Sequence, residues 1–400
     1  MLSLNMIVRD EAERIEACLA SVRDLVDEMV VVDTGSTDAT VAVATAAGAR
    51  VERLDWPGDF APARNSALTF LNGDWVLVLD ADERLRPEVI PQLQQLMAEP
   101  DVLVINLLRH ELGAAMAPYS RVSRLFRRHP GIRWSRLYHS MIDDSVAELL
   151  RSEPQWRVVD CPEPAILHDG YRPELLADSD KADRLRQAME SELAAQPGDP
   201  YASAKLAGLL ISEGRQTQAI PMLRSGLEQA TQPNAERYEL LLHLAMALTP
   251  TDAEAAIDCY RQALAIPMDP RASLGARVNL AARLMECGAV DEAIQLTESA
   301  AKAAPEVALT WANLGLMQRQ KGDIAAALEA YSHAIRLDPG NPTCQQNRAV
   351  ALLLGGDIEG ARAGFRSAIQ LFHAQGREQE ARALREKAQG LVKLDLEPVL

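Results

Sequence analysis

The chain has 400 residues, which is enough for two or more domains that each bury a core of their own. Its formal net charge of −16 disfavours nucleic acid as a partner, because the phosphates of the nucleic acid would be repelled. No apolar run approaches the about 18 residues of a membrane span, and five scattered cysteines show no C-x-x-C pattern, so we expect a soluble, cytoplasmic protein with no transmembrane segment or signal peptide.

The first 80 residues predict alternating strands and helices. Short apolar runs at Leu2–Val8, 29–33 and 75–79 are typical of buried strands. A helix with one apolar face follows the first run, and a helix at 39–47 follows a Gly-Ser-Thr-Asp turn that offers N-capping side chains. This alternation predicts an α/β domain with a parallel, doubly wound sheet and right-handed crossovers.

Acidic side chains follow two of these strands. Asp33 ends the second strand, and Asp80-Ala81-Asp82-Glu83 comes directly after the third. Open α/β sheets bind ligands at the carboxyl ends of their strands. Mg²⁺ and Mn²⁺ take oxygen ligands, often one or two carboxylates together with substrate phosphates. The pair at 80 and 82 therefore predicts a metal-bridged phosphate site, although such pairs also occur in solvated turns.

No G-x-G-x-x-G pattern and no Walker lysine follows any of these strands, which disfavours a dinucleotide enzyme or a P-loop NTPase. Instead, four motifs in this order resemble those of family 2 glycosyltransferases: Met6-Ile7-Val8-Arg9-Asp10-Glu11, Val32-Asp33-Thr34-Gly35-Ser36-Thr37-Asp38, Phe60-Ala61-Pro62-Ala63-Arg64-Asn65 and Trp75 followed by Asp80-Ala81-Asp82-Glu83. The resemblance covers residues 1–190 and implies a GT-A fold, with a Rossmann-like, mostly parallel central sheet that binds a nucleotide sugar. The subgroup that the chain resembles most carries tetratricopeptide repeats behind the catalytic domain.

The resemblance also implies roles for single residues. Asp33 would accept hydrogen bonds from the base or ribose of a UDP-type donor, and Arg64 would bind the diphosphate through charge-assisted hydrogen bonds. Asp80 and Asp82 would bring in Mg²⁺ or Mn²⁺, with Asp82 as the direct ligand and Asp80 nearer the ribose. The cation would neutralise the charge that develops on the departing nucleoside diphosphate. Asn65 would hold the neighbouring loop or contact the nucleotide.

Structural alternatives exist for three of these residues: Asp33 could only cap a turn, Arg64 could pair with Asp59, and Asn65 could cap a helix.

The acceptor half departs from the family pattern. An inverting transferase needs a carboxylate base that deprotonates the acceptor hydroxyl, and the subgroup has His-Glu after an Arg-Leu-Phe-Arg stretch and a tryptophan. In this chain the stretch at 124–127 and the tryptophan match, but the dipeptide is His139-Ser140. Serine cannot do the work of the glutamate. Asp143 or Asp144 becomes the candidate base, unless both residues only cap a helix.

Three later residues complete the implied donor site. His168 lies in Ile166-Leu167-His168-Asp169-Gly170-Tyr171, which resembles the His-x-Gly-Tyr element of the subgroup, and would be a metal ligand or a diphosphate contact. Lys181 and Arg184, on the helix expected next, match basic positions of the subgroup. These two residues would bind the phosphates, or else lie along the surface with their charged ends in solvent.

From residue 199 the chain becomes helix-rich and repeats every 34 to 37 residues. Small residues and prolines recur at fixed places, most clearly at Trp311, Leu314, Gly315, Gly322, Ala327, Tyr331, Ala334 and Pro339. This pattern is typical of tetratricopeptide repeats. We predict five helical pairs at 199–373 and a charged capping helix at 375–394, within a terminal segment 375–400. The concave face of such a solenoid normally binds a peptide or protein, although the repeats could instead only stabilise or dimerise the enzyme.

The residues and the resemblance together predict an inverting, metal-dependent glycosyltransferase of the hexosyltransferase type. Its donor would be a UDP-sugar, and its acceptor could be a protein or peptide held by the repeats. The alternative is a scaffold protein whose transferase domain binds a nucleotide sugar without turning it over, because Ser140 replaces the expected base. A sugar-1-phosphate nucleotidyltransferase is disfavoured, since no Gly-rich loop with Arg or Lys follows the first strand.

Overall fold

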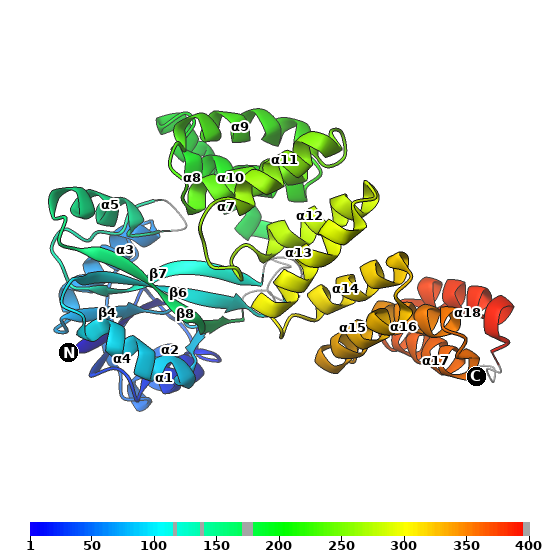
Figure 1. The fold of residues 1–400 in the computed structure, drawn as a ribbon. Helices are drawn as coiled ribbons and strands as arrows, with labels where there is room; N and C mark the ends of the chain where they lie inside the picture. Colours follow the sequence, from blue (N-terminus) through cyan, green and yellow to red (C-terminus); the bar gives the residue numbers. More distant parts are fainter. Residues whose placement is uncertain (115–117, 137–139, 170–178, 395–400) are drawn as a thin grey trace. The chain divides into compact units, whose positions relative to one another are not determined.

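The computed structural model describes residues 1–114, 118–136, 140–169 and 179–394. The chain divides into two units, Met1–Ala247 and Leu248–Leu400, which are described separately (Figure 1). The first unit contains a sheet covered by helices and continues into further helices, whereas the second unit is helical. The predicted fold class, an α/β domain followed by a run of helices, is confirmed.

A mixed sheet forms the centre of the first unit. Its strands in the described residues follow the order β3-β2-β1-β4-β7-β6-β8-β5. Strands β2, β1 and β4 are parallel, as predicted; β3 also pairs with β2 in parallel, and β6 pairs with β8 in parallel. Strand β7 runs antiparallel to β4 and β6, and β5 runs antiparallel to β8. The bounds are β1 Leu2–Val8, β2 Glu28–Asp33, β3 Arg50–Arg53, β4 Trp75–Val78, β5 Glu83–Leu85, β6 Val102–Glu111, β7 Tyr119–Arg127 and β8 Arg157–His168.

Helices cover both faces of this sheet (Figure 1). Helices α1, α2 and α4 pack against one face through buried side chains such as Leu19, Ala44 and Leu93. Helices α3 and α5 pack against the other face, where Ala67 and Val146 are buried. The bounds are α1 Ile15–Val22, α2 Thr40–Ala46, α3 Phe60–Ala67, α4 Ile90–Ala98 and α5 Asp143–Ser152, with short 3-10 helices at Leu68–Phe70 and Pro87–Val89.

A β-bulge interrupts the pairing of β7 with β6. The register shifts between Ile105 and Leu107, so that Ser123 and Arg124 both lie opposite Asn106. Bulges bend a strand and change the direction of its side chains, and they are frequent next to functional sites. The side chains of both bulge residues contact carboxylates near the end of the sheet. Ser123 contacts Asp143, and Arg124 contacts Asp80, which follows β4.

The first unit continues into helices α7 (Ser179–Ala195), α8 (Pro200–Ser212), α9 (Gln216–Gln229) and α10 (Ala235–Leu248). Asp199 caps α8, because its Oδ1 accepts a hydrogen bond of 2.9 Å from the backbone N–H of Ala202. Helices α9 and α10 approach closely at Gly226, where a Cβ atom would lie 2.9 Å from a methyl carbon of Leu240.

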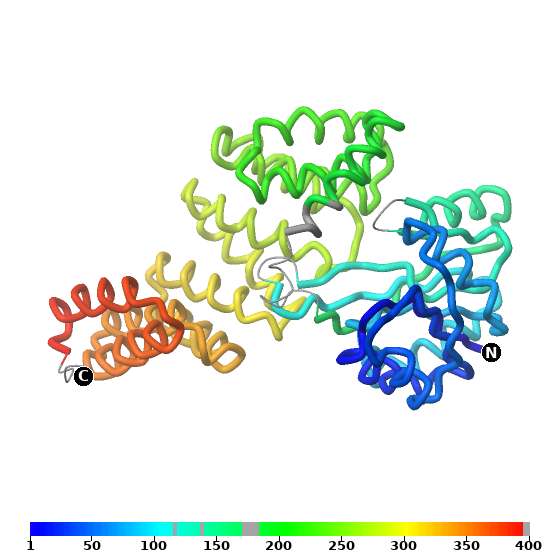
Figure 2. The backbone as a smooth tube through the Cα atoms, turned by 180° about the vertical axis from the view of Figure 1, so that it is seen from behind, coloured from blue at the N-terminus to red at the C-terminus, as the bar shows by residue number. Residues whose placement is uncertain are grey.

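The second unit is a series of helical hairpins, which Figure 2 follows from yellow to red. Within the described residues, three successive hairpin turns carry Gly288, Gly322 and Gly356, 34 residues apart, and each has a positive φ of 81–92°. The helices are α11 Ala253–Leu264, α12 Leu274–Glu286, α13 Val290–Ala303, α14 Ala308–Lys321, α15 Ile324–Leu337, α16 Pro342–Leu354, α17 Ile358–Ala374 and α18 Glu378–Val392.

The capping helix expected at 375–394 is present as α18, and its buried face, which includes Leu384 and Val392, joins the core that contains Phe365 and Phe372 of α17. Among the described residues, no helix combines the length and the apolar composition that crossing a bilayer requires. Strands β3, β5, β6 and β7 had no counterpart in the predicted elements, and only the start of β8, at 157–159, was foreseen.

The contact between α14 and α15 gives a test of the helical packing. A Cβ atom on Gly315 would lie 2.7 Å from the ring of Tyr331, a side chain that is fully buried and cannot move aside. We expect Gly315→Ala to lower the free energy of unfolding by about 1–3 kcal/mol, measured by urea denaturation.

Gly390→Ala in α18 is the matched control, since nothing lies within 4 Å of its added Cβ. Alanine is the better helix former, so this variant should gain about 0.5–1 kcal/mol. Equal effects of the two substitutions would contradict the close approach of α14 and α15.

Candidate functional site

The predicted donor residues gather at one edge of the sheet, because β2, β1 and β4 are neighbours and run in the same direction. Asp33 is the last residue of β2, and Asp80 and Asp82 follow β4. Asp10 and Glu11 follow β1, which lies between the other two strands. Carboxylates from three strands therefore meet at the carboxyl end of the parallel half of the sheet.

Asp80 lies between two arginines. Its Oδ1 accepts a hydrogen bond of 2.7 Å from Nη2 of Arg64, and its Oδ2 accepts one of 2.9 Å from Nη2 of Arg124. The indole ring of Trp134 covers both guanidinium groups, with Cζ of Arg64 at 4.9 Å and Cζ of Arg124 at 6.0 Å from the ring centroid. Burial acts to raise the pKa of Asp80, but the charges of Arg124 and Arg64 hold it far below its usual range.

Asn65 holds the segment that carries Trp134. Its Nδ2 donates a hydrogen bond of 2.9 Å to the carbonyl oxygen of Trp134, and its Oδ1 accepts one of 2.8 Å from the Trp134 backbone N–H. The side-chain amide thus pairs with both backbone groups of one residue, as a neighbouring strand would. Of the roles expected for Asn65, the geometry provides the loop-holding one.

A series of side chains with alternating charge leads from Glu83, the residue after Asp82, back to Asp82. Arg109 donates a hydrogen bond of 2.8 Å from Nη1 to Oε1 of Glu83, and another of 2.8 Å from Nε to Oε1 of Glu111. Oε2 of Glu111 contacts Nδ1 of His168, whose Nε2 lies 3.4 Å from Oδ2 of Asp82. Glu83 is fully buried, and Arg109 is its ion-pair partner at 2.8 Å.

His168 lies between the carboxylates of Asp82 and Glu111. Burial acts to lower the pKa of His168, but the hydrogen bonds to Asp82 and Glu111 raise it to about 9. The imidazole is therefore protonated at neutral pH, and it completes the alternation of charge. Metal ligation by His168 requires the neutral ring, so the ion pair with Asp82 would have to open first.

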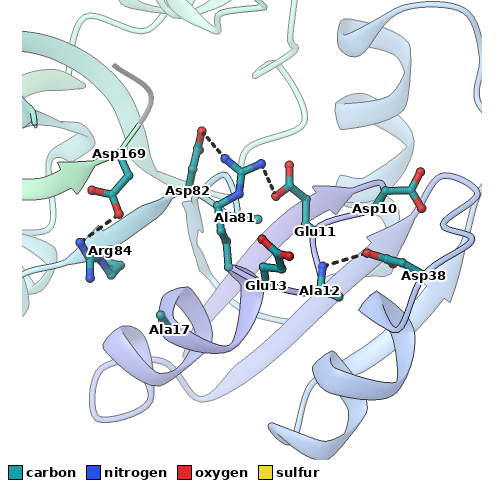
Figure 3. A pocket seen from close by; sticks show the side chains of 11 residues that line it. Asp10, Glu11, Ala12, Glu13, Ala17, Asp38, Ala81, Asp82, Arg84 and Asp169 are labelled. Atoms are coloured by element: carbon teal, nitrogen blue, oxygen red, sulfur yellow. Dashed lines mark hydrogen bonds and ion pairs between the residues drawn. The ribbon is translucent and has the colours of Figure 1, made fainter. Parts of the chain in front are cut away.

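A cavity of 630 Å³ opens beside Asp82, between the ends of β1 and β4 (Figure 3). Six of its lining side chains are carboxylates and two are guanidiniums. Arg14 pairs with two of these carboxylates, with Nη2 at 2.7 Å from Oε2 of Glu11 and Nη1 at 3.9 Å from Oδ2 of Asp82. The lining consists of Asp10, Glu11, Ala12, Glu13, Arg14, Ala17, Asp38, Ala81, Asp82, Arg84 and Asp169.

Asp33 makes the contacts expected of a residue that caps the turn after β2. Its carboxylate accepts hydrogen bonds from the backbone N–H of Gly35 at 3.3 Å and from that of Ser36 at 3.1 Å. Gly35 has a φ of 108°, which residues other than glycine rarely adopt. These contacts fix the direction of the carboxylate and leave lone pairs for a ligand, because a carboxylate can accept about four hydrogen bonds.

The side chains of three predicted site residues are not described. His139, expected on the acceptor side, lies outside the described residues, and Lys181 and Arg184, expected on the donor side, are on α7 with side chains that the structure does not describe. Asp143 and Asp144 form the first turn of α5, where carboxylates interact favourably with the helix dipole. Desolvation raises the pKa of Asp143. For Asp144, burial acts in the same direction, but hydrogen bonds from Arg136 and Ser135 hold its pKa below the usual value.

The site fits a divalent cation only if a ligand shares it. Among the described side chains, no group of three or more His, Cys, Asp and Glu is arranged to hold a metal by itself. Asp82 and His168 offer two potential ligands, and Mg²⁺ commonly takes its remaining ligands from substrate phosphates and water. Both oxygens of Asp80 are bonded to arginines, so ligation by Asp80 would require one of these bonds to open.

Several site residues were not predicted from the sequence. The motif matches included Arg124 and Glu83 but gave them no role, and Arg14, Arg109 and Glu111 were not singled out. One signal was available. Arg109 and Glu111 are charged residues two apart at the end of an otherwise apolar strand, which is the pattern of a buried polar cluster at a sheet edge.

Comparison with known proteins gives matches over both units. Residues 3–154 match the family model "Glycosyl transferase family 2", and residues 308–341 match "Tetratricopeptide repeat". A TPR repeat-containing protein of Synechococcus elongatus is 44% identical over 392 residues, which are 98% of this chain and 97% of that protein. An uncharacterized glycosyltransferase of Rickettsia bellii is 32% identical over 136 residues, 32% of this chain and 46% of the relative's length. The solved structure of MamA aligns with 43% of this chain and 97% of its own, at 20% identity and a TM-score of 0.38.

The buried triad of Asp80, Arg64 and Arg124 gives a pH-dependent test. Asp80→Asn leaves two guanidiniums without their anion, so we expect it to lower the free energy of unfolding at pH 7. The loss should be about 1–3 kcal/mol, less than for a fully buried pair, because 35% of the Asp80 side chain is exposed.

The folded-state pKa of Asp80 lies below its unfolded value of about 3.9. Its stabilising contribution is therefore present above that pH and is lost as the pH falls toward the folded pKa. Urea denaturation should show the same gap between the parent and Asp80→Asn at pH 7 and pH 5, and a narrower gap at pH 3, where the loss has begun. Asp24→Asn, at an exposed carboxylate, should match the parent throughout. A constant gap between parent and Asp80→Asn at all three pH values would contradict the triad.

Proposed function

The chain belongs to glycosyltransferase family 2, in the form that continues into tetratricopeptide repeats, and we propose that it transfers a sugar from a UDP-sugar to a protein or peptide acceptor. The proposed reaction is of the hexosyltransferase type, proceeds with inversion and depends on Mg²⁺ or Mn²⁺. The observation that carries the proposal is the acidic cavity beside Asp82, at the strand ends where α/β sheets bind nucleotides. We also propose that the protein acts in the cytoplasm.

The charge of this cavity favours a cation-bound donor. A diphosphate placed among six carboxylates and two guanidiniums would be repelled on its own. A divalent cation, when bound, would supply the positive charge that offsets both the carboxylates and the leaving diphosphate. Asp82 is the proposed ligand, with His168 as a second ligand or as a direct contact of the diphosphate, and Asp33 is proposed to accept a hydrogen bond from the nucleoside.

Arg64 and Arg124 are suited to bind phosphate oxygens. Within the described chain, Nε and Nη1 of Arg64 and Nη1 of Arg124 are buried and have no hydrogen-bond acceptor. Buried donors without an acceptor cost free energy, and a diphosphate oxygen would satisfy them through charge-assisted hydrogen bonds. Asp80 holds the two guanidiniums side by side, which makes it a positioning group for them. Lys181 and Arg184 are proposed to add positive charge on the phosphate side.

Asp143 is the better candidate for the acceptor-side base. Its raised pKa makes its carboxylate a stronger base than that of Asp144, both of whose oxygens are bonded to Arg136. Oδ1 of Asp143 also accepts a hydrogen bond of 3.0 Å from Ser123, the neighbour of Arg124 in the bulge of β7. His139 is proposed as a further acceptor-side group.

The repeats are proposed to recruit the acceptor. In the second unit, a groove of 490 Å³ lies between α14, α16 and the turn before α18. It is lined by amides such as Asn313, Asn347 and Gln375, which can pair with the backbone of a bound peptide. A peptide held by the repeats would reach the transferase at a raised effective concentration.

A second candidate function is a scaffold that binds nucleotide sugar without turnover. Ser140 stands where the resemblance leads us to expect a glutamate base, and this observation favours the scaffold. The two functions differ in one measurable quantity, the release of nucleotide from a donor.

The test is a screen of UDP-sugars with Mn²⁺, read out as UDP release by the full chain. We expect turnover that EDTA abolishes. Asp82→Asn should lower kcat/KM by about 100-fold or more, and Asp24→Asn should leave it unchanged. Turnover by Asp82→Asn at the parental rate would contradict the role of Asp82. Binding of UDP by the parent without release from any donor would identify the scaffold.

A further inference from the structure

Arg136 connects three segments of the first unit. Its Nε and Nη2 donate hydrogen bonds to the two carboxylate oxygens of Asp144, at 2.9 and 3.2 Å. Its Nη1 donates a hydrogen bond of 2.8 Å to Oδ2 of Asp199 and lies 3.9 Å from Oε2 of Glu192. Only 16% of the arginine side chain is exposed, and 6% of Asp199. One guanidinium therefore joins α5, α7 and the start of α8 in a cluster that is buried at Asp199 and open to solvent at Asp144, whose side chain is 44% exposed.

The Asp199 end of this cluster is the beginning of the repeat helices. Oδ1 of Asp199 caps α8 while Oδ2 binds Arg136, so a single carboxylate serves both contacts. The guanidinium also lies over the ring of Tyr201, one residue into α8, at 5.5 Å from the ring centroid. The first repeat helix is thus fastened to Arg136 by an ion pair and by a ring contact.

The Asp144 end belongs to the acceptor half of the site. Ser135 and Met141 pair by two backbone hydrogen bonds of 2.8 and 3.0 Å, which join the two ends of the segment that contains Ser140. Oγ of Ser135 donates a hydrogen bond of 2.7 Å to Oδ2 of Asp144. The residue before Asp144 is Asp143, the proposed base.

Arg136 adopts a backbone conformation that arginine rarely has. Its φ is 73°, in the left-handed region. Glycine adopts this region readily, whereas for other residues it is unfavourable in conformational free energy. Such conformations persist where the surrounding contacts determine them, and they cluster at functional sites. A glycine would satisfy the backbone here, so the presence of arginine points to a requirement for the guanidinium.

We propose that Arg136 is a positioning residue that couples the first repeat helix to the acceptor half of the transferase site. It holds the first turn of α5, and with it Asp143, in a place fixed by Asp199. This inference rests on the proposed function, in which Asp143 acts on the acceptor. We call the contacts of Arg136 with Asp144 and Asp199 the clamp. The donor side, around Asp82, shares none of these contacts, so loss of the clamp should lower the rate of transfer and leave donor binding unchanged.

Asp199→Asn is the variant that isolates the clamp. Asparagine caps a helix as well as aspartate does, so α8 keeps its cap while Arg136 loses a charged partner. Asp323→Asn is the matched control, because Asp323 caps α15 through the same contact, an Oδ1 that accepts from the N–H three residues on. Arg136→Gly removes the guanidinium and also relieves the backbone conformation.

The first measurement is steady-state kinetics on the UDP-sugar that the parent turns over. We expect Asp199→Asn and Arg136→Gly each to lower kcat by about tenfold or more, with the donor KM within about twofold of the parent. The double variant should be no slower than the slower single variant, because both substitutions remove the same contact. An unchanged kcat in Asp199→Asn, a loss confined to the donor KM, or fully additive losses would overturn the proposal.

The second measurement does not depend on turnover. Hydrogen exchange of the Met141 and Val146 amides, which donate to the carbonyl oxygens of Ser135 and Ile142 at the start of α5, should be about tenfold faster or more in Asp199→Asn than in the parent, and unchanged in Asp323→Asn. Unchanged exchange in Asp199→Asn would overturn the coupling whatever the kinetics show. If the parent turns over no donor, the proposed function has failed, and the exchange experiment alone decides whether Arg136 couples the two segments.

Discussion

The site depends on one buried ionic contact, the carboxylate of Asp80 between the guanidiniums of Arg64 and Arg124. The three residues come from the turn after β4, from α3 and from β7, so the contact ties the parallel half of the sheet to its antiparallel half and to the helix layer above. Trp134 covers the two arginines, and Asn65 fixes the backbone of Trp134. Removing the charge of Asp80 would leave two arginines without the anion that they share, which makes this position costly to vary. Asp82, two residues beyond, is left to face the cavity.

The second constraint is the alternation of charge that leads from Glu83 through Arg109, Glu111 and His168 to Asp82. It crosses β5, β6 and β8, the strands at the far side of the sheet from β3. Buried ion pairs contribute little net stability, but each fixes the direction of its neighbour. In the proposed function, they orient Asp82 and His168 toward the place where a cation and a diphosphate would meet. Arg136 is proposed to position Asp143 in the same way, through its ion pairs with Asp144 of α5 and with Asp199, the N-cap of α8.

The sequence was sufficient to predict the parallel half of the fold. Apolar runs identify β1, β2 and β4, and the turn residues after them place Asp33, Asp80 and Asp82 at a common edge, since parallel strands end together. Strands β7 and β8 were not predictable in this way, because they carry charged residues such as Arg121 and Asp160 among their apolar ones. Strand β6 begins with an apolar run at 102–108 that only Asn106 interrupts, and it was missed although this signal was available. The partners of Asp80 were also hidden. Arg124 lies 44 residues from Asp80 in the sequence. The direction of its side chain depends on the bulge in β7, which no local sequence pattern predicts. The repeats, by contrast, are visible from their spacing alone, since Gly288, Gly322 and Gly356 recur where each hairpin turns.

The central claim is that a divalent cation joins the donor diphosphate to Asp82 while Asp80 stays with its arginines. Anomalous diffraction from crystals of the full chain grown with UDP and Mn²⁺ tests this most directly, because the manganese peak locates the ion without assumptions about the ligand. We expect a single peak within bonding distance of the Asp82 carboxylate, with Arg64 and Arg124 still bonded to Asp80. A peak elsewhere on the chain, or an Asp80 that has left both arginines to bind the metal, would contradict it.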